Sequence, residues 1–259
     1  MTDSMLSETT ASETPWQRYQ KDLERPDFQK DSAQEDAVKR LQSLYDKLVE
    51  AERDRSKPKA KLFRKLKKGK EEPVKGLYFW GGVGRGKTYL MDTFYESLPF
   101  DRKMRVHFHR FMQRVHNELG HYKGEKNPLT LVAAKFAVEA RVICFDEFFV
   151  KDITDAMILA TLFEELFKQG VVLVATSNIV PDDLYKDGLQ RARFLPAIDL
   201  VKRHCTVVNV DSGIDYRLRA LEHAELFHSP LGDDSAARLA REFRSIAGAE
   251  GHADEGLSI

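Results

Sequence analysis

Cysteine is scarce in this sequence: Cys144 and Cys205 are the two cysteines among 259 residues. Two cysteines cannot form a disulfide framework or a four-cysteine metal site, so an apolar core must hold the fold together. A chain of this length with 42% hydrophobic residues can bury such a core. We therefore expect a globular protein of a reducing compartment, with Cys144 acting as a small buried hydrophobe.

Long apolar runs and a net charge are also missing. No segment approaches the eighteen or so apolar residues of a membrane-spanning helix, and the polar N-terminus has no features of a targeting peptide. Lys and Arg together number 41, as do Asp and Glu, so no global field favours nucleic acid or an anionic membrane. These absences predict a soluble protein of a reducing compartment, which would meet a nucleic acid or an anionic membrane only through a local patch.

One segment of the sequence does carry a strong positive charge. The segment from Arg53 to Lys70 holds ten basic residues and one acid, a net charge of +9. Such a run is either a solvated linker or a contact for phosphates or for an acidic protein surface. An apolar seam of Leu62, Phe63 and Leu66 favours docking.

Four regions follow from the patterning. Residues 1–30 are polar, and we expect them to be mobile or ordered only where Trp16, Tyr19, Leu23 and Phe28 dock. Region 31–72 holds an amphipathic helix, opened by a capping box at Ser32–Glu35, and the basic segment. The core spans 73–217, and 218–259 forms a partial C-terminal helical region with one amphipathic helix (Leu239, Phe243 and Ile246).

The core alternates between apolar segments and helix-length segments. Alternation of this kind predicts an α/β fold with a parallel five-stranded sheet covered by helices on both faces. The strands are expected at 74–80, 104–109, 141–145, 171–175 and 206–210, and the helices at 87–98, 110–121, 129–139, 152–169 and 182–203.

The first predicted strand ends in a complete match to the phosphate-loop pattern G-x-x-x-x-G-K-[ST]. Its glycines let successive backbone N–H groups point at phosphates, and the following helix directs its positive end at the same anion. The lysine reaches the β- and γ-phosphates of ATP, and the threonine hydroxyl ligates Mg²⁺. The residues are Gly81, Gly82, Val83, Gly84, Arg85, Gly86, Lys87 and Thr88.

Polar residues follow two later strands. Asp146 and Glu147 end the third strand, where Asp146 would be either a direct or a second-sphere partner of magnesium. Glu147 would orient and polarise the attacking water. Asn178 ends the fourth strand and would hydrogen-bond the water or the γ-phosphate. Paired acids and a terminal Asn also occur as simple caps and turns, but the phosphate loop upstream favours a catalytic site.

Two arginines, Arg191 and Arg193, follow a short helix after the fourth strand. They are either surface charges or arginine fingers supplied to a neighbouring subunit's phosphate, and spacing does not say which of the two would act. Because the fingers would act in trans, we expect a homo-oligomer joined at the ATP interface.

Other candidate sites are weaker. His107 and His109 are predicted to share one face of a strand, with His116 on the next helix, but no third ligand stands at a telling spacing. We therefore expect ordinary surface or interface histidines rather than a metal site. No N-K-x-D segment is present, so adenine is favoured over guanine.

Several segments together resemble the ZapE family of cell-division ATPases and the related lactation-elevated ATPases. The resemblance implies an AAA+-type ATPase that destabilises tubulin-like filaments at the cytoplasmic division site, or, in mitochondrial relatives, one that acts in quality control at the inner membrane. It leaves peripheral membrane association open. The segments are GLYFWGGVGRGKTYLMD, RVHFHRFMQRVH, VICFDEFFVKDI, TSN and DGLQRARFLPAI.

The resemblance also implies a helical lid beyond this chain's end at Ile259. We therefore expect a fragment or a C-terminally shortened homologue, with nucleotide binding better supported than full turnover. Two alternatives stay open. The basic segment would suit a nucleic-acid motor or loader on the same core, although the overall charge does not favour nucleic acid. The missing lid would suit an ATP-gated adaptor that does not hydrolyse.

Overall fold

The computed structural model describes residues 13–26, 28, 30–56 and 73–211. The predicted helix near Leu239 and residues 57–70 of the basic segment lie outside that part. The described residues up to Gly82 and from Gly86 onward form one compact unit that contains every element below, whereas Val83–Arg85 belong to a second unit. The strands are β1 (Gly76–Trp80), β2 (Lys103–His107), β3 (Val142–Asp146), β4 (Val172–Ser177) and β5 (Cys205–Asn209).

All five strands pair in parallel, in the order β2-β3-β4-β1-β5. Strand β4 therefore lies between β1 and β3, and β2 and β5 form the edges. The predicted five-stranded parallel sheet is confirmed. The helices are α1 (Pro15–Asp22), α2 (Ser32–Ser56), α4 (Lys87–Ser97), α5 (Phe108–His121), α6 (Pro128–Glu139), α7 (Ile153–Lys168) and α8 (Leu195–His204), with short 3₁₀ turns η1 (Pro181–Asp183) and η2 (Arg191–Arg193).

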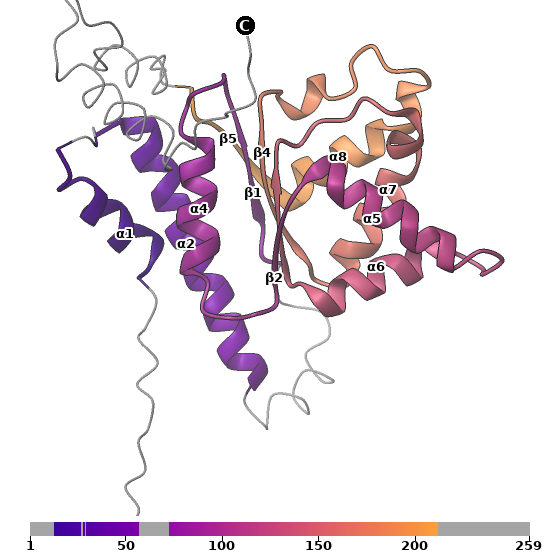
Figure 1. The fold of residues 1–259 in the computed structure, drawn as a ribbon, viewed down its shortest axis with the longest axis horizontal. Coiled ribbons are helices and arrows are strands. Elements are labelled where there is room, and N and C mark those ends of the chain that lie inside the picture. Colours follow the sequence, from indigo (N-terminus) through magenta and orange to yellow (C-terminus); the bar gives the residue numbers. More distant parts are fainter. Residues whose placement is uncertain (1–12, 27, 29, 57–72, 212–259) are drawn as a thin grey trace, which may run out of the picture. The chain divides into compact units, whose positions relative to one another are not determined.

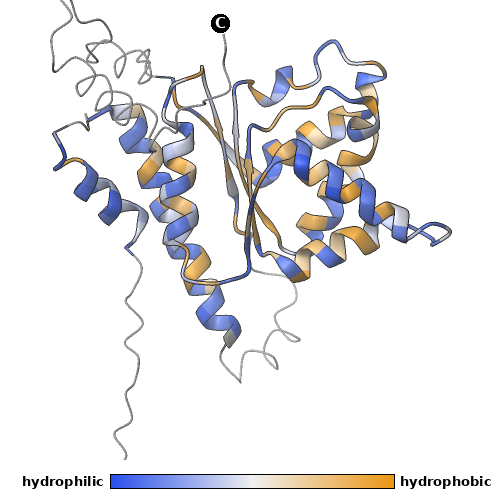
Figure 2. Ribbon diagram, in the orientation of Figure 1, coloured by the Kyte–Doolittle hydropathy of each residue, from blue (hydrophilic) through white to orange (hydrophobic). Residues whose placement is uncertain are grey.

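Helices cover both faces of the sheet, as expected (Figure 1). Because side chains alternate along a strand, neighbours such as Cys144 and Phe145 enter different cores. One face packs against α5–α8 in an aromatic core that includes Phe108, Phe111 and Phe163. The other face packs against α1, α2 and α4 in a largely aliphatic core. Figure 2 shows the hydrophobic residues along the strands and on the helices that pack against them.

The N-terminal region is ordered where its aromatic residues dock. Thr14 caps α1 in a capping box, and Tyr19 is fully buried in the core formed with α2 and α4. Of the two expectations for 1–30, order where the aromatic residues dock is the one that applies to 15–22. The helix α2 begins at Ser32, but its cap is Asp31, whose Oδ1 accepts from the N–H groups of Ala33 (2.7 Å) and Gln34 (3.1 Å).

Two predicted boundaries are wrong. The strand expected over 104–109 ends at His107, and Phe108 already begins α5, because Phe108, Phe111, Met112 and Val115 recur at helical spacing and are buried together. The single helix expected over 182–203 is instead η1, η2 and the shorter α8. Tyr185 and Gln190 take positive φ angles of 53° and 55°, which interrupts any helix there.

Candidate functional site

Three sequence-predicted groups meet at one edge of the sheet. Parallel strands present their carboxyl ends together, so the loop after β1, Asn178 after β4, and Asp146 with Glu147 at the end of β3 lie side by side along it. Because β4 separates β1 from β3, Asn178 stands between the loop and the acids. Ligands of open α/β sheets bind at this edge.

The loop after β1 has the backbone of an anion cradle. Gly84 and Gly86 take positive φ angles of 77° and 73°, which glycine adopts without strain. Gly86 is the cap of α4, and no side chain caps that helix end. The first-turn N–H groups of α4 thus remain available to an anionic ligand, and Thr88 is exposed on the same turn.

Lys87 folds back over this loop. Its Nζ donates to the carbonyl oxygens of Gly81 at 2.7 Å and Gly82 at 2.6 Å. A partly buried ammonium beside N–H groups suits a polyphosphate, and the neighbouring Thr88 hydroxyl and Asp146 carboxylate are hard oxygen donors of the kind Mg²⁺ takes. The residues present therefore fit a magnesium nucleotide.

Asp146 has a partner that the sequence reasoning missed. Nε of Arg105, in β2, donates to Asp146 Oδ2 at 2.8 Å, and the same guanidinium pairs with Asp92 of α4 through Nη1. The available signal was a charged residue inside a strand, between Met104 and Val106. Because alternating polar residues are common in edge strands, the sequence alone does not single out Arg105.

Glu147 is held through its backbone. Its φ of 53° is unusual for a residue other than glycine, and its side chain is exposed. The Glu147 N–H donates to Thr176 Oγ1 at 3.3 Å, and the Phe148 N–H donates to the Thr176 carbonyl at 2.7 Å. Phe148 itself is buried against Phe108. The turn between the strand end and this aromatic anchor presents the carboxylate to solvent, and such strained conformations cluster at functional sites.

Asn178 is also exposed, on a segment fixed at both sides. The Ser177 hydroxyl donates to the Phe148 carbonyl at 2.7 Å and accepts from the Ile179 N–H at 3.1 Å. The Tyr78 hydroxyl donates to the Ile179 carbonyl at 2.8 Å from within the core. Burial raises the pKa of Tyr78, so its hydroxyl stays protonated as a donor. Sequence reasoning missed these supports because only the fold brings them to Asn178.

The two arginines differ in their surroundings. Nη2 of Arg191 donates to the Asp182 carbonyl at 2.6 Å and so joins η2 to η1. Arg193 is exposed, and its Nη1 reaches Gln190 Oε1 at 3.2 Å within the same turn.

In the described part of the chain, His107, His109 and His116 do not gather around a possible metal site. His107 ends β2 and His109 lies in α5, so they do not share a strand face, although their rings lie 5.9 Å apart. His116 Nε2 instead lies 2.7 Å from Asp155 Oδ1. Among the described residues, no group of three or more His, Cys, Asp or Glu could hold a metal.

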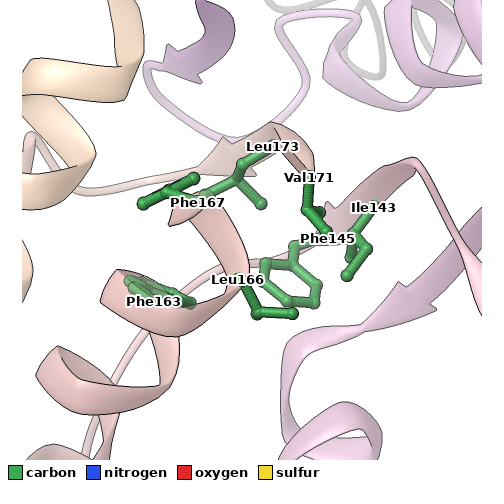
Figure 3. A pocket seen from close by; sticks show the side chains of 7 residues that line it. All are labelled: Ile143, Phe145, Phe163, Leu166, Phe167, Val171 and Leu173. Carbon is green, nitrogen blue, oxygen red and sulfur yellow. The ribbon is translucent and has the colours of Figure 1, made fainter. Parts of the chain in front are cut away.

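A small pocket between β3, β4 and α7 is not a nucleotide site. Figure 3 shows the apolar side chains that line it, with no polar group among them. The pocket belongs to the aromatic core.

Both cysteines, Cys144 and Cys205, are buried and form no disulfide. Burial raises the pKa of the Cys205 thiol to about 12.

None of the helices in the described ranges is both long enough and apolar enough to cross a membrane.

Comparison with known proteins places the chain in a family. It is 52% identical over 243 residues to the cell division protein ZapE of Escherichia coli K12, a match that covers 92% of this chain and 65% of that protein. It is 45% identical over 190 residues to lactation elevated protein 1 homolog B of Danio rerio, covering 69% of this chain and 38% of that protein. This chain thus spans less than two thirds of either relative.

Among solved structures, AMPPCP-bound DnaA from Aquifex aeolicus aligns over 85% of this chain and 61% of that chain, with 15% identity and a TM-score of 0.49. The family model for the AFG1-like ATPases matches residues 13–259, nearly the whole chain. The family's ATPase name agrees with the phosphate loop found at the end of β1. The chain belongs to the AFG1-like ATPase family.

Proposed function

We propose that this protein hydrolyses ATP with Mg²⁺ and couples hydrolysis to the remodelling of a protein assembly at the bacterial division site. The observation that carries the proposal is the meeting of the phosphate loop, Asn178 and the acid pair at one sheet edge. The family supports the ATPase activity, and the name of the Escherichia coli relative supports the link to division.

Each residue at the edge has a part in this proposal. Gly81–Thr88 would wrap the phosphates, with Lys87 leaving the loop carbonyls to neutralise the β- and γ-phosphates. Thr88 and Asp146 would hold Mg²⁺, which neutralises charge on the phosphates during transfer. Glu147 would accept the proton of the attacking water, and Asn178 would orient that water.

The first test is single-turnover hydrolysis by the purified chain, with phosphate release followed with and without Mg²⁺. We expect release that requires Mg²⁺. Binding of ATP without any release would make the chain an ATP-gated adaptor instead. Stimulation by single-stranded DNA, with an affinity that falls steeply with salt, would favour the nucleic-acid loader.

The remodelled partner in this proposal is a tubulin-like division filament, met in the cytoplasm. The test is co-sedimentation of such filaments with the chain. We expect less polymer in the pellet with ATP than without it, and no ATP effect with the Lys87→Ala variant. An equal amount of pelleted polymer under all conditions would exclude filament destabilisation.

Arg193 is the better candidate for a finger that acts on a neighbouring subunit's ATP. It is exposed and bonded within its own turn, whereas Arg191 is committed to the Asp182 carbonyl. Fingers accelerate phosphoryl transfer by about 10³-fold or more. Hydrolysis per subunit should therefore rise with protein concentration, and Arg193→Ala should abolish that rise.

A mixing experiment tests the contact between subunits. Arg193→Ala keeps an intact nucleotide site and Lys87→Ala keeps an intact finger, so a mixture should recover activity that neither variant has alone. Arg191→Ala should instead lower stability through the lost bond to η1. A mixture that stays inactive although the two proteins associate would remove the finger from the proposal.

A further inference from the structure

Arg105 joins two elements that the proposed chemistry must keep in register. It lies in the edge strand β2, and its guanidinium bridges Asp146 at the end of β3 and Asp92 in α4. Asp92 comes four residues after Thr88, which places both on the same face of α4. One side chain thus links the acid strand to the helix that begins at the phosphate loop.

The two carboxylate oxygens of Asp146 bind the Arg105 guanidinium unequally. Oδ2 accepts from Nε at 2.8 Å, whereas Oδ1 is 3.5 Å from Nη2, at the limit of a hydrogen bond. The carboxylate is therefore held mainly through Oδ2, and Oδ1, which makes only a weak bond to Nη2, can bind a further partner. Such an arrangement fixes the orientation of a carboxylate without using all its acceptor sites.

The setting makes this bridge stronger than an ordinary surface ion pair. The side chains of Arg105 and Asp146 are 22% and 16% exposed, and that of Asp92 is 41% exposed. An arginine guanidinium carries a charge in proteins at any ordinary pH, and here two carboxylates share it.

We propose that Arg105 is a positioning residue that orients the Asp146 carboxylate for Mg²⁺, with Asp92 holding Arg105 in place. This inference rests on the proposed function, because it assumes a magnesium nucleotide at the sheet edge. It predicts that loss of Arg105 weakens Mg²⁺ binding. The opposite role, in which Arg105 competes with Mg²⁺ for Asp146, predicts tighter Mg²⁺ binding after its loss.

The test titrates Mg²⁺ into the chain with a fluorescent, non-hydrolysable ATP analogue and follows binding of the analogue. Arg105→Gln should raise the Mg²⁺ concentration for half-saturation about tenfold, the lower range seen when outer partners of metal ligands are removed. Binding of the analogue in EDTA should not change. Arg105→Lys keeps the charge but loses the planar guanidinium. Its Mg²⁺ concentration for half-saturation should therefore lie between those of the wild-type chain and Arg105→Gln.

Two further variants test the positioning role of Arg105. Asp92→Asn should shift the half-saturation in the same direction by a smaller factor, and it applies if Arg105→Gln does not fold. Arg18→Gln is the matched control. Arg18, in α1, forms a surface ion pair with Glu96, which lies in α4 as Asp92 does. The Arg18→Gln variant should leave the titration unchanged.

The outcomes separate the two claims. A half-saturation that is unchanged or lower in Arg105→Gln and in Asp92→Asn, with normal binding by the wild-type chain, overturns the positioning role alone. An equal loss of binding in EDTA overturns it too, because the defect would then be general. Failure of the wild-type chain to bind the analogue at any Mg²⁺ concentration overturns the proposed function, and this inference with it.

Discussion

The phosphate loop and the acid edge of the candidate site are built in different ways. The loop comes from eight consecutive residues between β1 and α4, so its chemistry is contained in a local pattern. The acid edge is assembled from β2, β3 and β4, with Arg105, Asp146 and Thr176 each supplied by a different strand. A local element tolerates changes elsewhere in the fold, whereas an assembled one depends on every strand that contributes.

The two regions also differ in how their key charges are held. Lys87 is held by backbone carbonyls of its own loop, which a phosphate can replace. Asp146 and Glu147 are held by side chains from neighbouring strands. Substitutions in the loop should therefore affect ligand binding, and substitutions at the acid edge should affect the chemistry and its metal.

The largest effect is expected in the loop. Lys87→Ala removes the cation that lies over Gly81 and Gly82, so ATP binding should fall by more than tenfold and hydrolysis should be lost. Equilibrium binding of a fluorescent ATP analogue measures the first, and phosphate release the second. Lys47→Ala, at an exposed position on α2, is the control. Hydrolysis by Lys87→Ala at the wild-type rate would place the nucleotide elsewhere.

The next largest effect is expected at the acid edge, without loss of binding. Glu147→Gln keeps the size of the side chain but removes the charge that would accept the proton of water, so turnover should fall by about 10²- to 10⁴-fold. Binding of the analogue should stay within a factor of two or so. Parallel loss of both would mean that the strained turn at Glu147, rather than its carboxylate, is what the site needs.

The same contrast decides what could be predicted from the sequence. The strands were predictable from their apolar segments. The clearest were β3 and β4, which are buried on both faces and therefore consist of apolar runs. The loop and acid pair were predictable because each follows such a strand directly. The strand order that brings them together came from the fold, not from any local pattern.

The remaining misses have physical causes. Arg105, Thr176 and Tyr78 bond to Asp146, Glu147 and Ile179, each more than 25 residues away in the chain, so no short window contains both ends of these bonds. The end of β2 was misplaced because Phe108 continues the alternation of the strand and also begins the apolar stripe of α5. Helical spacing prevailed since it buries four side chains together.

A smaller effect should follow from removing one support of the acid edge. Thr176→Val keeps the shape of the side chain but removes the hydroxyl that accepts from the Glu147 N–H. We expect a loss of about 1 kcal/mol in the free energy of unfolding, and a fall in turnover with unchanged ATP binding. Thr206→Val, at an exposed position in β5, is the matched control for denaturant unfolding. If turnover is unaffected, Glu147 does not need Thr176.

The smallest effect is expected beneath Asn178. Tyr78→Phe removes the hydroxyl that donates to the Ile179 carbonyl at 2.8 Å, and the ring stays in the core. The free energy of unfolding should fall by about 1 kcal/mol, since the carbonyl loses its partner. Thermal and urea unfolding measure this.

Tyr95→Phe is the matched control for this change, because the Tyr95 hydroxyl makes a weak 3.5 Å bond to the Lys103 carbonyl and should cost less. Hydrolysis then distinguishes stability from positioning. Because Ser177 still holds the segment from its other side, turnover in Tyr78→Phe should fall less than in Thr176→Val. A larger fall in Tyr78→Phe would show that Asn178, rather than Glu147, depends most on being held in place.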